Sequence, residues 1–281
     1  MEIIDGKGLA EEIKREIASD VSLIKAEGGN VPHLAAVLVG DDPASHSYVR
    51  SKVNSCYQCG FESTLIKKDD SITEDELLEI VRDLNENPDI DGFIVQLPLP
   101  KHIDESKVTL AIDHRKDVDG FHPINFGRMA QGLSSYLPAT PYGILQMLER
   151  KKIKTEGKHC VVLGRSNIVG TPMSILLSRK GNPGNCTVTL THSRTKDITE
   201  ELLRADIIVA AIGIPHFVTA NMVKEGVVII DRGYRLVGDV DYESVGPKCS
   251  FITPVPGGVG PMTVTSLLMN TLKAASKSIY D

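Results

Sequence analysis

The sequence predicts an α/β protein with two open α/β domains, the second Rossmann-like, and a C-terminal helix that returns to the first domain. Short apolar runs alternate with stretches of helical periodicity along the chain, which is the pattern of parallel sheets covered by helices. A glycine-containing loop follows one of these runs, between Gly164 and Gly170. The length of 281 residues suits two compact domains better than one or three.

The first half of the chain alternates helix and strand. Residues 8–27 carry apolar side chains at steps of three and four among charges and stop at two glycines, as an amphipathic helix does. Thr73 and Glu76 form a capping box at the start of another helix. Pro98 and Pro100 end the third apolar run, because proline cannot continue a strand ladder. The expected elements are helices at 8–27, 44–59 and 73–85 and strands at 34–39, 62–67 and 91–96.

The pattern loosens between residues 113 and 140, which we interpret as the passage between domains. Pro141 can open a helix at its first turn, and the alternation then resumes until the proline- and glycine-rich turn at 254–261. The expected helices here are 141–149, 171–178, 199–203 and 263–278, and the expected strands are 160–163, 187–191, 207–211 and 227–230. We therefore place one domain at residues 1–138 with 262–281, and the other at residues 139–261.

Composition and charge restrict the classes of partner. The formal net charge is -6 and the pI is near 5.8, so no basic field attracts nucleic acid or an anionic membrane. No stretch approaches the roughly 18 apolar residues of a membrane span, and the first residues lack a signal-peptide pattern. We expect a cytoplasmic protein that binds neither nucleic acid nor membrane.

The five cysteines predict neither a disulfide framework nor a metal site. Cys56 and Cys59 have the spacing of half a zinc site, but no second Cys or His pair with matching spacing follows, and a zinc site needs about four ligands. We interpret this pair as reduced thiols on a helix and expect no bound metal.

The loop after the fourth predicted strand is a candidate dinucleotide site. Gly164 allows a tight turn, Gly170 permits close backbone approach, and the helix that follows offers N–H groups to a pyrophosphate. The usual G-x-G-x-x-G pattern is absent, and two glycines after a strand are more often an ordinary turn. Arg165 lies in the loop, and Ser193 with Arg194 follows the next strand, where the adenosine ribose is expected. Two cations and a hydroxyl suit a ribose 2′-phosphate and so favour NADP over NAD. The alternative interpretation is that both arginines are solvated surface charges.

A polar helix face in the first half is a candidate substrate site. Ser45, Tyr48 and Lys52 fall at steps of three and four on a helix that should begin at the carboxyl edge of the sheet. Gln96 ends the third predicted strand at the same edge. A lysine held in a cleft by such neighbours would suit proton transfer near neutral pH, although a helical lysine is usually a solvated charge. Asp119 lies in a polar turn that is, by itself, more often structural.

Five segments together resemble a known family. They are residues 48–52, 95–100, 116–123, 164–170 and 254–263. In order and over nearly the whole chain, they resemble the bifunctional methylenetetrahydrofolate dehydrogenases/cyclohydrolases of the FolD type. The resemblance implies oxidation of 5,10-methylenetetrahydrofolate by NADP and hydrolysis of the methenyl product to 10-formyltetrahydrofolate. It also implies a homodimer that serves one-carbon metabolism and purine biosynthesis.

The resemblance assigns roles by motif position. It implies that Lys52 is catalytic, that Gln96 positions it, and that Tyr48 stacks on or orients the folate. Asp119 is expected to bind the pterin ring, and Ser45 is a weaker supporting candidate. The other residues expected against the folate are Val95, Leu97, Pro256, Gly257, Gly258, Val259 and Gly260. The residues expected on the dinucleotide are Gly164, Arg165, Ser166, Ser193 and Tyr234.

One departure from the family pattern falls at the expected nicotinamide end. Family members usually read Asp-Val-Gly-Ile or Asp-Cys-Gly-Ile there, whereas Arg232 and Tyr234 flank the glycine in this chain, and their bulk could alter cofactor preference or oligomer packing.

The alternative functions are a monofunctional NAD-linked methylenetetrahydrofolate dehydrogenase, another two-domain dehydrogenase and a non-catalytic folate or dinucleotide-binding module. The presence of Lys52 together with Tyr48 and Gln96 argues against the first and the last of these.

Overall fold

The computed structural model describes residues 1–233 and 236–280 and divides the chain into two compact units. Unit 1 comprises Met1–Ala10 with Thr140–Thr263, and unit 2 comprises Glu11–Ala139 with Val264–Asp281. The predicted boundaries placed residues 1–10 in the other domain. They belong to unit 1 because β1 (Glu2–Ile3) pairs with β9 (Cys249–Ile252), and a strand of two residues carries no periodicity that a sequence pattern could reveal.

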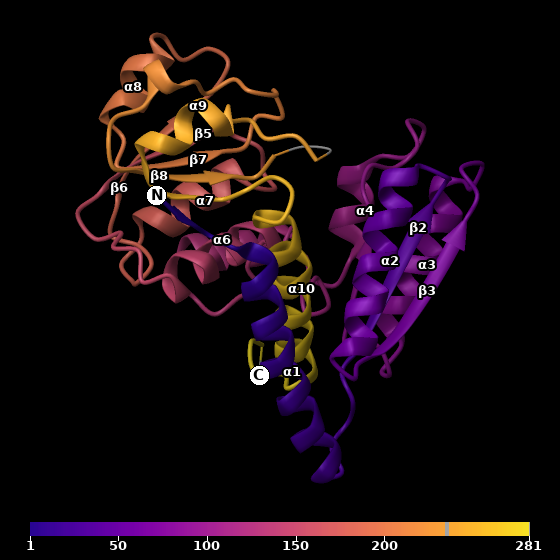
Figure 1. The fold of residues 1–281 in the computed structure, drawn as a ribbon. Helices are drawn as coiled ribbons and strands as arrows, with labels where there is room; N and C mark the ends of the chain where they lie inside the picture. Colours follow the sequence, from indigo (N-terminus) through magenta and orange to yellow (C-terminus); the bar gives the residue numbers. More distant parts are fainter. Residues whose placement is uncertain (234–235, 281) are drawn as a thin grey trace. The chain divides into compact units, whose positions relative to one another are not determined.

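Unit 1 contains a six-stranded parallel sheet in the order β1-β9-β8-β7-β5-β6 (Figure 1). The remaining strands are β5 (His159–Leu163), β6 (Thr187–Thr191), β7 (Ile207–Ala210) and β8 (Val227–Asp231). Strand β6 lies on one side of β5 and β7 lies on the other, so the direction of winding reverses between β5 and β7. Open α/β sheets bind their ligands at the carboxyl edge beside such a reversal. The predicted Rossmann-like domain is confirmed.

Helices cover both faces of the unit 1 sheet. They are α6 (Ala139–Arg150), α7 (Gly170–Ser178), α8 (Ile198–Arg204) and α9 (Tyr242–Val245), with short 3-10 turns at Ala220–Met222 and Gly246–Lys248. Helices α8 and α9 lie on one face, and α6 and α7 lie on the other (Figure 1). Leu202 of α8 and Val245 of α9 are fully buried in one cluster with Val161 and Ile208 of the strands, which fixes the first pair of helices to the sheet.

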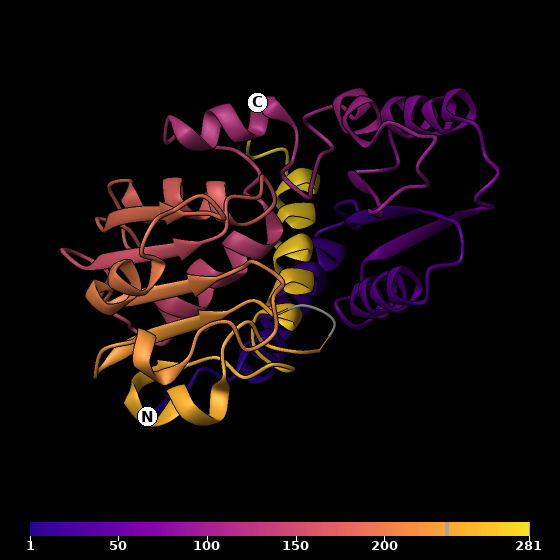
Figure 2. The same cartoon turned by 90° about the horizontal axis from the view of Figure 1, so that it is seen from above.

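Unit 2 contains a three-stranded parallel sheet in the order β3-β2-β4. Its strands are β2 (His33–Val39), β3 (Glu62–Lys68) and β4 (Gly92–Val95). Helices α3 (Glu74–Glu86) and α4 (Glu105–Ala111) cover one face and α2 (Pro43–Gln58) covers the other (Figure 2). Leu77 of α3 and Val108 of α4 are buried against Val37 and Phe93. The predicted capping box of Thr73 and Glu76 is present at the start of α3.

The last helix, α10 (Val259–Ala275), begins earlier than the predicted residue 263. Pro261 fits in its first turn because the first N–H groups of a helix have no intrahelical acceptor. Helices α10 and α1 (Gly6–Ala26) lie side by side (Figures 1 and 2). In unit 2 the buried Asn270 of α10 donates to the carbonyls of Val118 at 2.8 Å and Leu137 at 2.9 Å. The C-terminal helix therefore joins the first domain, as predicted.

Three short helices were not predicted, namely α4, α5 (Pro123–Ala130) and α9. Helix α4 is capped by Asp104, whose carboxylate accepts from the backbone of Ser106 at 2.8 Å. Helix α5 lies in the segment interpreted as a passage between domains, and His122 caps it by accepting from the backbone of Ile124 at 3.1 Å. In the part of the chain described, no helix is long and apolar enough to cross a membrane.

Candidate active and cofactor sites

Helix α2 begins where β2 ends, and its first turn is fixed by a cap. The Asp42 carboxylate accepts from the backbone N–H of Ser45 at 2.8 Å and from its hydroxyl at 2.9 Å, and Pro43 supplies a helical φ without an unpaired N–H. The buried hydroxyl of Ser45 is thus engaged in capping, which accounts for this candidate without a ligand. The cap fixes the start of α2 at the carboxyl edge of the sheet. The next two turns of the helix carry Tyr48 and Lys52.

Lys52 and Gln96 meet in unit 2. Lys52 is only 7% exposed, and its Nζ donates to Oε1 of Gln96 at 3.2 Å. The Gln96 backbone N–H donates to the carbonyl of Val37 at 2.9 Å, and its side-chain Nε2 donates to the carbonyl of Leu97 at 2.6 Å. Because both ends of this amide are engaged, its oxygen stays turned toward the amine. The structure therefore brings together two of the residues that the sequence singled out, from a helix and from the end of a strand.

The other predicted substrate residues of unit 2 lie near this edge of the sheet. Tyr48 is 45% exposed, so its ring is open to a ligand. The Phe93 backbone donates to the carbonyl of Lys116 at 3.0 Å, and Phe93 forms a parallel bridge with Asp117. Val95 ends β4 and is buried. The half-buried Asp119 lies in the turn that directly follows the bridge.

A buried carboxylate shapes the turn that contains Asp119. Asp117 accepts from the backbone N–H groups of Phe121 at 3.2 Å and His122 at 2.8 Å, and from Nδ2 of Asn125 at 2.9 Å. Burial raises the pKa of Asp117 to about 7. Gly120 has a φ of +74°, and a Cβ there would lie 2.6 Å from the backbone carbon of Leu137, so the turn requires glycine.

In unit 1, the loop after β5 has the steric properties expected of a dinucleotide loop. Gly164 has a φ of +106°, and a Cβ there would lie 2.4 Å from the carbonyl oxygen of Ala211, which follows β7. A Cβ on Gly170 would lie 1.9 Å from the carbonyl oxygen of Gly164. The loops after β5 and β7 therefore meet closely at the reversal of the strand order, and glycine is required at both positions.

The start of α7 differs from the expectation that its N–H groups are free for a pyrophosphate. The Ser166 hydroxyl accepts from the backbone of Val169 at 3.2 Å, and the Ser166 carbonyl accepts from the backbone of Thr171 at 3.0 Å. Pro172 has no N–H. That expectation is therefore wrong for these amides, because the loop already pairs them. The exposed part of the loop, which includes Arg165 and Ser166, is what a ligand can reach.

Ser193 and Arg165 follow adjacent strands at one edge. Leu163 of β5 is in register with Thr191 of β6, and Arg165 and Ser193 each lie two residues beyond this pair. Both residues are exposed. The His192 backbone donates to Thr195 Oγ1 at 2.9 Å, so the turn that presents Ser193 is fixed internally. This arrangement suits two groups that bind one phosphate.

Sequence reasoning missed two buried aspartates in unit 1. Asp239 Oδ2 accepts from the backbone N–H groups of Ile212 at 2.7 Å and Gly213 at 3.1 Å, directly after Ala211. Asp231 accepts from the backbone N–H groups of Gly233 at 2.9 Å and Asp239 at 3.0 Å. Burial raises the pKa of Asp231 to about 6. Asp239 stands in a loop with no motif, so no signal in the sequence distinguishes it from a surface carboxylate. Asp231 ends β8 and opens the Asp-x-Gly pattern noted above, but that pattern does not show that its carboxylate accepts backbone hydrogen bonds.

The predicted folate residues 256–260 lie in a loop and at the start of the helix that follows it. The Gly257 carbonyl accepts from the Lys7 backbone at 2.9 Å, and a Cβ on Gly6 would lie 1.9 Å from the carbonyl oxygen of Gly258. Pro256, Gly257 and Gly258 thus form a loop packed on the start of α1, while Val259 and Gly260 belong to α10. Tyr234, expected on the dinucleotide, lies outside the described residues.

The five cysteines are free and buried. Burial raises the pKa of Cys56 to about 12 and of Cys59 to about 11, which keeps both thiols protonated near neutral pH. Over residues 1–233 and 236–280, no group of three or more metal-binding side chains is clustered.

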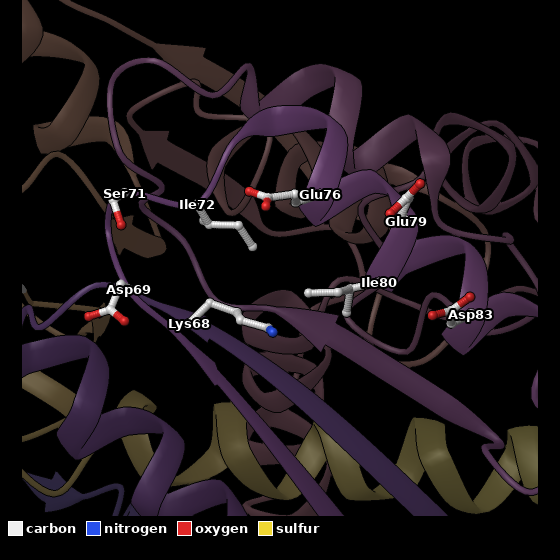
Figure 3. A pocket seen from close by; sticks show the side chains of 8 residues that line it. All are labelled: Lys68, Asp69, Ser71, Ile72, Glu76, Glu79, Ile80 and Asp83. Carbon is white, nitrogen blue, oxygen red and sulfur yellow. The ribbon is translucent and has the colours of Figure 1, made fainter.

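A surface pocket of about 470 Å³ lies between β3 and α3 (Figure 3). Its lining residues are Lys68, Asp69, Ser71, Ile72, Glu76, Glu79, Ile80 and Asp83. None of them is a predicted site residue. Four carboxylates against one amine form a poor site for an anionic dinucleotide, so this pocket does not compete with the loop after β5.

Two family models match most of the chain. Residues 4–119 match the model of the tetrahydrofolate dehydrogenase/cyclohydrolase catalytic domain, and residues 138–279 match the model of the NAD(P)-binding domain of the same family. The Bifunctional protein FolD of Flavobacterium johnsoniae is 61% identical over 286 residues, which cover 98% of this chain and 97% of that protein.

Solved structures give the same match. The bifunctional FolD methylenetetrahydrofolate dehydrogenase/cyclohydrolase of Campylobacter jejuni is 44% identical with a TM-score of 0.94 and covers 99% of each chain. The FolD methylenetetrahydrofolate dehydrogenase-cyclohydrolase of Trypanosoma brucei, complexed with NADP and an inhibitor, is 35% identical with a TM-score of 0.93, covering 99% of this chain and 98% of that one.

Proposed function

The chain belongs to the tetrahydrofolate dehydrogenase/cyclohydrolase family, and on that premise we propose that it carries out both reactions with NADP. It oxidises 5,10-methylenetetrahydrofolate to 5,10-methenyltetrahydrofolate and hydrolyses this product to 10-formyltetrahydrofolate. The observation that carries the proposal is the buried amine of Lys52, held by Gln96 at the carboxyl edge of the unit 2 sheet. An amine held in a fixed position beside a neutral acceptor is well placed to exchange a proton with a bound ligand.

The oxidation step needs positioning more than acid or base chemistry. A hydride leaves the methylene carbon as the lone pair of a neighbouring nitrogen forms the new C=N bond, so no side chain has to remove a proton. NADP, when bound, supplies the hydride acceptor. Gly164, Arg165, Ser166 and Ser193 would hold it, together with Tyr234. The close approach of the loops after β5 and β7 leaves room for backbone there but not for side chains, which fits a dinucleotide.

The hydrolysis step needs proton transfer. Water adds to the methenyl carbon and loses a proton, and one ring nitrogen gains a proton as its bond to that carbon breaks. We assign this transfer to Nζ of Lys52, with Gln96 holding the amine in place. Tyr48 stacks on or orients the folate, and Asp119 accepts hydrogen bonds from the pterin ring. Val95, Leu97 and residues 256–260 complete the folate contacts.

Two groups favour NADP over NAD. Arg165 and Ser193 follow adjacent strands, and a guanidinium with a hydroxyl suits the 2′-phosphate of the ribose. An acidic residue, which would instead bind the ribose hydroxyls of NAD, is absent from positions 192–194 after β6. We further propose that the protein acts as a homodimer and serves one-carbon metabolism, including purine biosynthesis, because the resemblance implies each of these. We also propose that it does so in the cytoplasm.

Purified protein mixed with 5,10-methylenetetrahydrofolate and NADP tests this function. NADPH absorbance should rise, the absorbance of the methenyl compound should appear and decay faster than in buffer, and NAD should support a lower kcat/KM. NADPH formation without accelerated methenyl decay would contradict the bifunctional assignment. The absence of both changes would leave only the non-catalytic binding module.

A further inference from the structure

We propose that Tyr280, near the C-terminus, is a positioning residue for the turn that carries Asp119. The inference rests on the proposed function, because it gives Tyr280 a part in folate binding through Asp119. Tyr280 and its partners all belong to unit 2. The Tyr280 hydroxyl donates to Oδ1 of Asn125, which lies 155 residues earlier in the chain.

The Asn125 amide is the centre of the connection. This side chain is fully buried, and all of its hydrogen-bonding capacity is used. Nδ2 donates to the carbonyl of His114 at 2.9 Å and to Oδ2 of Asp117 at 2.9 Å. Oδ1 accepts from the backbone N–H of Tyr136 at 3.2 Å and from the Tyr280 hydroxyl. With donors facing its oxygen and acceptors facing its nitrogen, the amide has one orientation, and Tyr280 is one of the two donors that fix it.

Asp117 passes this restraint to the turn. Its carboxylate is 2% exposed and accepts the Asn125 amide together with the backbone N–H groups of Phe121 and His122. No basic side chain forms an ion pair with it in the described chain, since the guanidinium of the nearby Arg115 is bound to Asp113. A buried carboxylate compensated only by N–H donors depends on each of them. Asp119 lies between Asp117 and these two amides, so the network sets the position of Asp119.

The Tyr280 ring is held on several sides, which makes the tail a defined element and not a loose end. The His114 ring meets it edge-on at 4.8 Å between centroids, and the Tyr136 ring lies 5.8 Å away. The Arg128 guanidinium carbon lies 4.8 Å from its centroid, within cation–π distance. These contacts place the hydroxyl at Asn125 before any ligand arrives. The far side of the same turn is held by Asn270, which donates to the carbonyl of Val118.

The test compares Tyr280→Phe, which removes only the hydroxyl, with Tyr57→Phe, which removes a hydroxyl from an exposed ring on α2. Loss of one neutral hydrogen bond in the network should raise the KM for 5,10-methylenetetrahydrofolate by about 2- to 10-fold. The KM for NADP and the kcat at saturation should not change. In the ligand-free protein, amide exchange at Phe121 and His122 should become at least about twofold faster. Tyr57→Phe should match the wild type in all four measurements.

Three results would overturn the inference. An unchanged folate KM and unchanged amide exchange in Tyr280→Phe would show that the hydroxyl does not act on the turn. Equal increases in the KM for folate and for NADP, with a lower melting temperature, would reduce its role to general stability. If the wild type shows no turnover of methylenetetrahydrofolate, the proposed function fails and the folate role of Tyr280 fails with it. Amide exchange would then still report whether the hydroxyl holds the turn.

Discussion

The side chain of Lys52 allows a sharp test of the hydrolytic step. Lys52→Met keeps a long, flexible side chain of similar volume and removes the amine that donates to Gln96. Cyclohydrolase activity should fall by at least about 100-fold, because positioned proton transfer contributes that much or more. Binding of NADP should persist, since the predicted cofactor residues belong to unit 1. Decay of methenyltetrahydrofolate absorbance, corrected for decay in buffer, measures the first effect, and NADPH fluorescence titration measures the second.

Lys67→Met is the matched control, because Lys67 is exposed on β3 and stands outside the proposed site. It should hydrolyse methenyltetrahydrofolate as the wild type does. If Lys52→Met hydrolyses at the wild-type rate, the amine has no catalytic role.

Single residues show how far the sequence could lead. The spacing of Tyr48 and Lys52, with Gln96 after a strand, predicted that they share one edge of a sheet, and the contact between Lys52 and Gln96 agrees with that prediction. Ser45 shares the same spacing, yet its hydroxyl serves the Asp42 cap. A spacing rule identifies a helix face but does not distinguish a cap from a ligand contact. The structural role of Asp117 could not be predicted for a similar reason. The N–H groups that donate to its carboxylate belong to backbone that comes close only when the turn has folded.

Among the connecting elements, the loop after β7 gives the next prediction. Asp239 fixes the backbone of Ile212 and Gly213, beside the loop that carries Gly164. Asp239→Asn replaces two charge-assisted hydrogen bonds with weaker neutral ones. The KM for NADP should rise by about 3- to 10-fold, whereas the KM for methylenetetrahydrofolate should change less than twofold. Steady-state kinetics with each substrate varied in turn measures both constants.

Asp197→Asn removes the same charge from an exposed position of unit 1 whose side chain caps nothing. Its KM values should equal those of the wild type. A similar rise in the NADP KM in both variants would mean that net charge, and not the Asp239 contacts, controls cofactor binding.

Long periodic elements were predictable and short ones were not. Helices α1 and α3 and strands β2 and β6 lie within one or two residues of their predicted bounds, because burial of one face imposes a regular apolar pattern. Strands β1 and β9 are held by pairing across the chain, and helices α4 and α5 by caps. Such elements are too short to show a period. The glycine pattern predicted the turn after β5, but it could not show that Ser166 would pair the N–H groups at the start of α7.

At the scale of the whole molecule, two parallel sheets in separate units place every proposed ligand group of the strands at a carboxyl edge. Parallel strands need long connections, and those connections supply the loops after β2, β4, β5, β6 and β7 from which the sites are built. The alternation of apolar runs and helices was therefore sufficient to predict the sheet edges at which we propose that ligands bind. It was not sufficient to assign the first ten residues, because β1 adds to a sheet whose other strands lie beyond residue 158.

The buried carboxylate of Asp117 should make the stability of the protein depend on pH. Its pKa in the folded protein is about 7, above the ordinary value of 3.8, so the folded state holds a proton that the unfolded state releases between these values. The contribution of Asp117 is therefore fully present below about pH 4 and is lost as the pH rises through 7. The shift corresponds to at most about 4 kcal/mol. In Asp117→Asn this contribution is absent, while one carbonyl oxygen remains to accept the backbone donors.

Urea unfolding from pH 4 to pH 8 tests this dependence, followed by tyrosine fluorescence because the chain has no tryptophan. The free energy of unfolding of Asp117→Asn should rise relative to that of the wild type as the pH increases, with most of the change between pH 4 and pH 7. Asp89→Asn, at an exposed position of unit 2, should run parallel to the wild type. If Asp117→Asn also runs parallel over this range, the carboxylate titrates near its ordinary value, and the backbone donors and Asn125 fully offset its burial.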